Sequence, residues 1–80
     1  MSIKWNGKYI KELLKENNMT QKQLSKELNV SKQTINSWIN GTVPKGKHLV
    51  QMIIRFNADI DKFFIKEVPN IIIPSLHIDY

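Results

Sequence analysis

The 80-residue sequence predicts an all-α domain of five short helices, followed by a short extended or β C-terminal tail. Apolar residues recur at helical spacing from Ile10 to Phe64, which indicates helices that share one core. The last segment instead holds Ile71-Ile72-Ile73 between two prolines, a pattern that excludes a continuing helix. We therefore expect a domain over residues 1–64 and a tail over residues 65–80.

The first helix is expected to follow Asn6, a residue type that caps helix N-termini. Trp5 and Ile10 occupy the positions of a hydrophobic staple around this cap. Asn17-Asn18 ends the helix, because asparagine tolerates the left-handed conformation found there.

The second and third helices are separated by a very short turn. Thr20, followed three residues later by Gln23, has the form of a capping box and begins the second helix. Ser31 is the expected N-cap of the third helix, which runs over residues 32–40 and stops at Gly41. So short a turn makes two helices cross steeply, as in a helix-turn-helix.

Two further helices complete the predicted domain. The fourth is expected from about Lys47 to Phe56, after a loop that contains Pro44. The fifth is a short helix capped by Asp59.

Charge is distributed unevenly along the chain. Residues 1–58 carry nine lysines and one arginine against three glutamates, whereas residues 59–80 carry two lysines against four acidic residues. A basic body favours a polyanionic partner, although charge alone leaves nucleic acid, an anionic membrane surface and simple solubility open. The sequence has no cysteine, no metal-ligand spacing, no signal peptide and no apolar run long enough to span a membrane. We expect a cytoplasmic protein without metal, cofactor or small-molecule ligand, and not an enzyme.

The segment from Thr20 to Gly41 resembles the Cro and phage-repressor class of helix-turn-helix domains. Gln21 stands at the start of the second helix of the chain, and the small Ser25 follows four positions later. Trp38 lies three positions before Gly41, the glycine that ends the segment. The resemblance extends over roughly residues 6–64 and implies a lambda-repressor-like fold of five helices that binds DNA.

One departure from the class concerns its core. Many members have an arginine at the position of Leu14 and a glutamate at that of Ile39, which form a partly buried ion pair. Replacing both partners of a buried pair by apolar residues can be neutral or stabilising. We therefore expect Leu14 and Ile39 to touch in the core.

The resemblance also implies which side chains contact DNA. The start of the third helix enters the major groove, where side chains that hydrogen-bond can identify base pairs. The residues expected to contact bases are Lys32, Gln33, Asn36 and Ser37. Those expected to contact phosphates are Gln21, Lys22, Ser31, Thr34, Asn40, Lys45 and Lys47. For Ser31 the helix cap is the first role, and Lys22 is the weaker candidate.

A domain of this kind commonly binds a palindromic site in double-stranded DNA as a homodimer. The apolar residues of the tail 65–80 either join the tail of a second copy or fold back as a strand on their own domain, and Ile54 is a further candidate for a dimer interface. The favoured function is a transcription regulator, most simply a repressor of phage or mobile-element origin. Two alternatives stay open: a protein-binding module on the same scaffold, such as an antitoxin or a phage-encoded inhibitor, and the DNA-binding part of a longer regulator.

Overall fold

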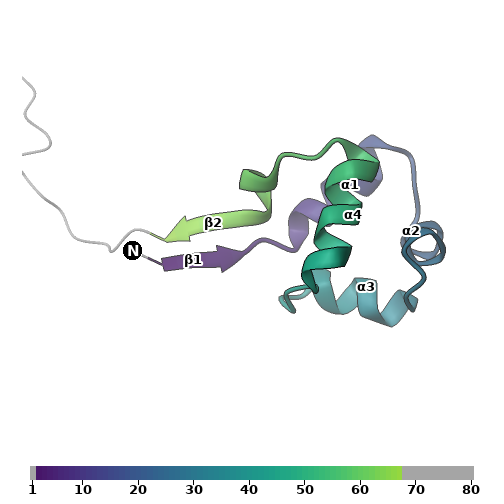
Figure 1. Cartoon of the computed structure of the whole chain (residues 1–80), viewed down its shortest axis with the longest axis horizontal. Helices are drawn as coiled ribbons and strands as arrows, with labels where there is room; N and C mark the ends of the chain where they lie inside the picture. The colour runs from purple at the N-terminus through teal and green to yellow at the C-terminus, as the bar shows by residue number, and fades with distance from the viewer. Residues whose placement is uncertain (1, 68–80) are drawn as a thin grey trace, which may run out of the picture.

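Four α-helices form the body of the molecule, and a two-stranded antiparallel ribbon projects from one end (Figure 1). The computed structural model describes residues 2–67. In chain order the elements are β1 (Ser2–Trp5), α1 (Lys8–Glu16), α2 (Gln21–Leu28), α3 (Lys32–Ile39), α4 (Gly46–Phe56), the 3-10 helix η1 (Ile60–Phe63) and β2 (Phe64–Glu67). None of the helices in this part of the chain is long and apolar enough to cross a membrane.

The helices surround a single apolar core. Its fully buried side chains come from every helix and include Ile10, Leu24, Ile35, Met52 and Phe63. Leu14 and Ile39, which the sequence predicts to touch, are both buried members of this cluster, with 6% and 7% of their surface exposed. Direct contact between these two side chains stays a prediction.

The beginning of α1 differs from the prediction. Its N-cap is Gly7, with no side-chain hydrogen bond, so Asn6 is not the cap. The Asn6 side chain instead donates from Nδ2 to the carbonyl oxygen of Lys62, 2.9 Å away. Trp5 lies in a strand rather than in a hydrophobic staple. The end of α1 is as predicted, because Asn17 is its C-cap and Asn18 has a left-handed backbone with φ 55°.

The prediction of a fifth α-helix is also wrong, because the segment forms a 3-10 helix. Asp59 caps the segment as expected, accepting a hydrogen bond from the Asp61 N–H at 3.0 Å. The segment is nevertheless only a four-residue 3-10 turn, and Phe64 has an extended backbone with φ −131° and ψ 141°. Pairing of Phe64 with Trp5 in the ribbon accounts for this stop, because a residue in a strand ladder cannot continue a helix.

The ribbon joins the two ends of the domain. Strand β1 is antiparallel to β2, with Trp5 opposite Phe64 and Ile3 opposite Lys66. The sequence did not predict β1. It did predict an extended tail, and residues 65–67 fold back on the N-terminal strand of their own domain, one of the two alternatives considered. The expected roles of residues 68–80 lie outside the described residues.

Candidate nucleic-acid interface

A capping box holds the start of α2, as the sequence predicts. The Thr20 hydroxyl accepts the Gln23 N–H at 3.1 Å, and the Gln23 side-chain oxygen accepts the Thr20 N–H at 2.8 Å. These bonds satisfy two backbone donors that a helix start leaves free. The helix ends at Asn29, which has a left-handed backbone with φ 57° and turns the chain toward α3.

Ser31 caps α3, again as predicted. Its hydroxyl oxygen accepts the Thr34 N–H at 3.1 Å, and the two hydroxyl groups are 2.8 Å apart. Both side chains therefore already take part in a local network at the helix start. Contact of Ser31 and Thr34 with phosphate stays a prediction.

The inner sides of α2 and α3 pack closely. Ser25, predicted as the small residue of this contact, is 6% exposed, and its hydroxyl donates to the Lys22 carbonyl at 2.7 Å, so the buried oxygen is satisfied. Ile35 and Trp38 are buried on the inner side of α3. With these residues inside, the opposite side of α3 faces outward.

The outward side of α3 carries three of the four predicted base-contacting residues. Lys32, Gln33 and Asn36 are all exposed. Together with the half-buried Gln21 at the start of α2, they line one shallow surface depression. The amide groups supply both donors and acceptors, and the lysine supplies a positively charged donor. The structure therefore places Gln21 beside these three residues on one exposed surface. Contact of α3 with a DNA groove requires such a surface.

Two other predicted contacts have hydrogen bonds within α3. Ser37 is half-buried, and its hydroxyl donates to the Thr34 carbonyl at 2.7 Å. Asn40 is exposed and donates from Nδ2 to the Asn36 carbonyl at 2.9 Å. A hydroxyl has one donor hydrogen and an amide has two. In this arrangement Asn40 keeps an N–H for a phosphate oxygen, whereas Ser37 offers only its lone pairs.

The predicted phosphate-contacting lysines lie on α2 and at the start of α4. Lys22 is exposed on α2, Lys45 is the exposed residue just before α4, and Lys47 is exposed in the first turn of α4. None of them forms an ion pair within residues 2–67, where the Arg55–Glu27 pair at 2.6 Å joins α4 to α2. These lysines are therefore available to an external anion.

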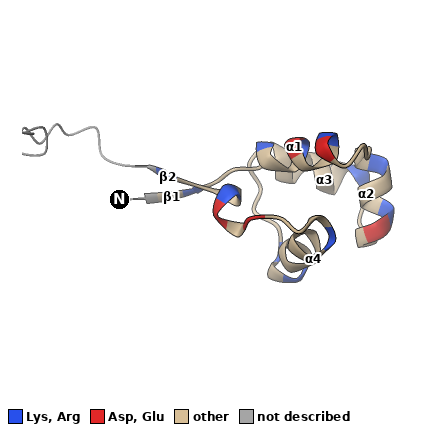
Figure 2. Ribbon diagram, turned by 90° about the horizontal axis from the view of Figure 1, so that it is seen from above, with Lys and Arg blue, Asp and Glu red and all other residues tan. Residues whose placement is uncertain are grey.

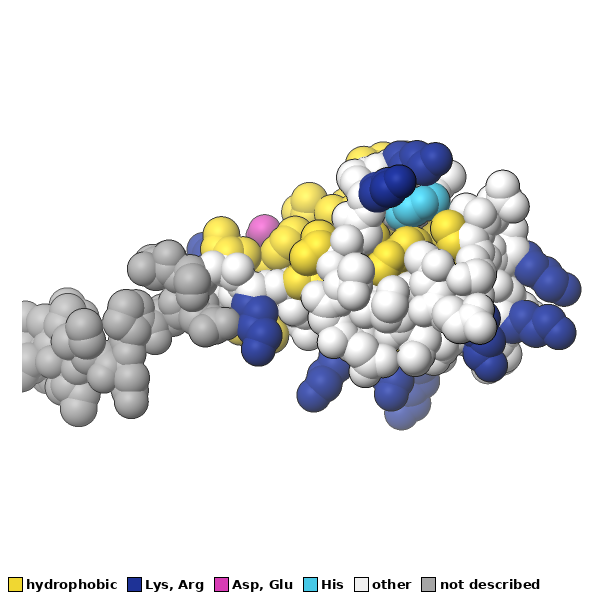
Figure 3. Space-filling model, turned by 90° about the horizontal axis from the view of Figure 1, so that it is seen from below, with side chains coloured by type: hydrophobic (Ala, Val, Ile, Leu, Met, Phe, Trp, Pro, Cys, Tyr) yellow, Lys and Arg dark blue, Asp and Glu magenta, His cyan; other side chains and the backbone are white. Residues whose placement is uncertain are grey.

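The charged residues of the segment that contains α3 and α4 all have one sign. Residues 28–58 contain three lysines and one arginine but no acidic residue. Figure 2 shows the acidic residues on α1, on α2 and near η1. Figure 3 shows the molecule from below, which is the side on which α3 lies in Figure 1. Basic side chains surround the body in this view, and the acidic side chain that is visible lies beside the ribbon. Glu27 on the neighbouring α2 is paired with Arg55, so its charge is partly balanced toward a phosphate backbone placed against α3.

The ribbon positions the far end of α3, a feature that the sequence reasoning missed. The Trp5 indole N–H donates to the Trp38 carbonyl at 2.7 Å, and the Trp5 ring stacks on Phe63 with centroids 5.4 Å apart. Gly7 lies so close to α3 that a Cβ atom at this position would be 2.0 Å from the Trp38 carbonyl oxygen. The available signal was a tryptophan close to the N-terminus, although its partner is 33 residues away.

Comparison with known protein families identifies the segment that contains α2 and α3. A family model described as helix-turn-helix matches residues 10–63, which is more than half of the chain. Comparisons with curated proteins and with solved structures gave no significant match. The matched range begins in α1, ends in η1, and contains every residue that the sequence predicts to contact DNA.

Proposed function

Because the chain belongs to the Cro/C1-type helix-turn-helix family of DNA-binding regulatory domains, we propose that it binds double-stranded DNA sequence-specifically as a transcription regulator, acting as a repressor. Residues 32–40, which are α3 and its C-cap, enter the major groove. The observation that supports this proposal most is the depression shared by Gln21 and three residues of α3, Lys32, Gln33 and Asn36, which belong to a segment, residues 28–58, without acidic residues.

Base recognition depends on the exposed amides of α3. The Gln33 and Asn36 side chains can each pair with adenine through one donor and one acceptor, and the Lys32 ammonium can donate to guanine. Ser37 has only lone pairs to offer in this arrangement, so its hydrogen bond is to a donor on a base edge, and any contact with a sugar is van der Waals. The sequence read by the protein is therefore expected to contain adenines at two positions and a guanine beside them.

Phosphate contacts fix the position of α3 in the groove and supply most of the affinity. Gln21 meets one strand at the N-terminus of α2, where free N–H groups also point outward. Lys22, Lys45 and Lys47 contribute charge, while Ser31, Thr34 and Asn40 contribute polar contacts at the two ends of α3. Each lysine that neutralises a phosphate raises the salt dependence of binding.

The proposal includes a homodimer on a palindromic operator, since one such helix reads few base pairs and two half-sites multiply the specificity. A cytoplasmic location follows from DNA as the partner. The proposed mechanism involves no cofactor and no catalytic step.

Selection of bound DNA from a random pool, repeated at several salt concentrations, tests the proposal. Enrichment of a palindrome with affinity that falls steeply as salt rises would support it. Binding of similar strength to all sequences would leave only electrostatic attraction and would contradict sequence-specific regulation.

One observation favours a second candidate, a protein-binding module. Val50 and Ile54 lie one turn apart on α4 and are 52% and 76% exposed, so together they present an apolar area to solvent. If no DNA sequence is enriched, a protein target for this side of α4 becomes the better account. A role as the DNA-binding part of a longer regulator is compatible with either function.

A further inference from the structure

One surface of the ribbon is apolar, and the other described residues, 2–67, leave much of it exposed. Residues directly opposite each other in an antiparallel pair project from the same face, so Ile3 shares a face with Lys66, and Trp5 shares it with Phe64. Trp5 is buried at the inner end, but Ile3 is 66% exposed and Phe64 is half-buried. Figure 3 shows hydrophobic side chains gathered on this side of the molecule, from the ribbon toward the body.

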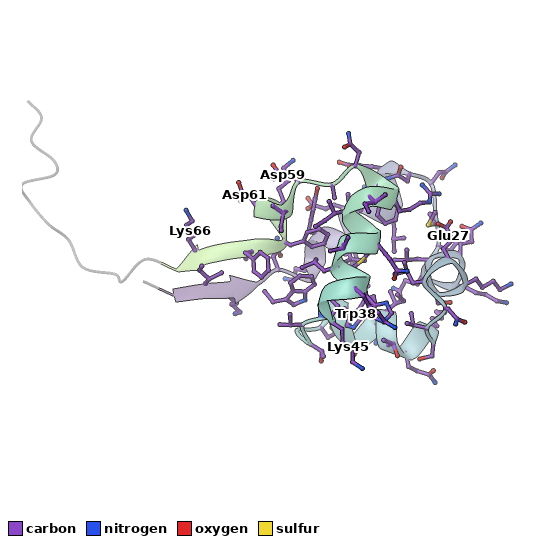
Figure 4. All side chains as sticks on the ribbon, in the orientation of Figure 1. Glu27, Trp38, Lys45, Asp59, Asp61 and Lys66 are labelled. Atoms are coloured by element: carbon purple, nitrogen blue, oxygen red, sulfur yellow. The ribbon has the colours of Figure 1, made fainter. Side chains whose placement is uncertain are left out.

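Two opposite charges stand at the rim of this surface. Ile3, Phe64, Asp61 and Lys66 line one surface hollow, which we call the ribbon face. Asp61 comes from η1 and Lys66 from β2, and Figure 4 shows both pointing toward the same side of the ribbon. Neither side chain belongs to an ion pair within the described part of the chain.

This arrangement is complementary to itself. A two-fold axis uses the same patch on both molecules, so a residue on one side of the patch meets a residue on the other side. An axis through the apolar centre of the ribbon face would place Lys66 of one copy against Asp61 of the other, and the reverse. The same operation would bring Ile3 of one copy toward Phe64 of the other, and the reverse, so that both side chains become covered.

We propose that the ribbon face is the surface through which two copies of this chain associate. An isolated two-stranded sheet is only marginally stable in water, and a second ribbon packed on its apolar face would stabilise it. The face is small, so association of the free protein is expected to be weak and to strengthen on DNA.

The placement of α3 supports a two-fold arrangement, a step that rests on the proposed DNA-binding function. The ribbon projects from the end of the molecule opposite α2, and α3 lies along the lower side (Figure 1). A two-fold axis that runs vertically in this view, in the contact plane between the two ribbon faces, would leave both α3 helices on the lower side. Two recognition helices on one side of a dimer is the arrangement that two half-sites about 34 Å apart require.

Charge reversal in the full-length chain tests the proposal by sedimentation, from about 10 to about 500 µM, the concentrations at which so small an interface is expected to associate. Lys66→Glu and Asp61→Lys should each weaken association by about tenfold or more, because each places like charges opposite one another. The double variant should return the dissociation constant to within about threefold of the original, since the pairs re-form with exchanged signs. A residue that merely supports the fold would not show this restoration.

Ile54→Glu on α4 is the matched control, since it also places a charge in an exposed apolar position. It should leave association unchanged, and thermal melting by circular dichroism should show that all variants fold. A chain that stays monomeric throughout, single variants that associate normally, or a double variant as weak as the singles would each overturn the proposal. Loss of association in Ile54→Glu alone would assign the interface to α4.

The DNA selection distinguishes failure of this inference from failure of the proposed function. A monomeric chain that still enriches one sequence would overturn the ribbon-face dimer and leave DNA recognition standing. A chain that associates through the ribbon face but enriches no sequence would overturn DNA recognition and leave the ribbon-face dimer standing.

Discussion

Replacement of Gly7 by alanine tests how closely α1 and α3 approach each other. A Cβ atom at Gly7 would lie 2.0 Å from the carbonyl oxygen of Trp38 and 2.7 Å from that of Ile39, both backbone atoms at the end of α3. Gly7 has helical dihedral angles, φ −63° and ψ −23°, so alanine suits its backbone. On backbone grounds alone, Gly7→Ala would stabilise the fold by about 0.4–1 kcal/mol. The sign of the effect therefore decides whether the close approach is real.

The overlap is expected to outweigh the backbone gain. Overpacking a core costs about 1–3 kcal/mol, and here the clash is with two backbone carbonyls that cannot move without moving α3. We expect a net loss of about 2 kcal/mol, which for a domain this size lowers Tm by roughly 8–16 °C. Thermal and urea unfolding followed by circular dichroism would measure it.

Gly46 provides the control for this experiment. It is the first residue of α4, and a Cβ atom there would meet nothing within 4 Å. Gly46→Ala should therefore leave the free energy of unfolding unchanged or raise it by up to about 1 kcal/mol. If Gly7→Ala proves as stable as the original protein or more stable, α1 does not approach α3 as described, and the positioning of α3 by the N-terminus is refuted.

Three further substitutions examine the candidate interface. Gln33→Ala should cost about 1–3 kcal/mol of binding at one base position, measured as affinity for the selected DNA against single-base variants, and equal loss on all sequences would remove Gln33 from base readout. Lys45→Ala should weaken binding to every sequence alike and reduce the slope of log affinity against log salt by about 1, with Lys11→Ala on α1 as the control that leaves the slope unchanged. Ser31→Ala removes the cap of α3 and should lower the free energy of unfolding by about 1 kcal/mol, whereas an unchanged unfolding midpoint would mean that the bond to the Thr34 N–H contributes nothing.

Much of the helical body could be predicted from the sequence, because its signals are local. Thr20 and Gln23 are three residues apart and make both bonds of the predicted capping box. Ser31 and Asn18 likewise act within one turn of their own positions. The outward position of Gln33 on α3 follows from helical periodicity once Ile35 and Trp38 are assigned to the core.

The ribbon could not be predicted, because its strands lie about sixty residues apart and its determinants are not local. Strand β1 has only four residues, too few to show a reliable alternation, and no turn connects it directly to β2. Because of this pairing, Trp5 lies in a strand and not in the predicted hydrophobic staple. The same pairing limits the predicted fifth helix to a 3-10 turn. The errors at Asn6, Trp5 and Phe64 therefore have one common cause.

The central claim is that α3 and the start of α2 form the surface that meets DNA. Titration of the selected DNA duplex into the isotope-labelled full chain, followed by amide chemical shifts in NMR spectra, tests this claim most directly. The largest shift changes are predicted at Gln21, Lys32, Gln33 and Asn36, with smaller changes near Lys45. Changes that concentrate on α1 or on the exposed side of α4, with these four amides unmoved, would contradict it.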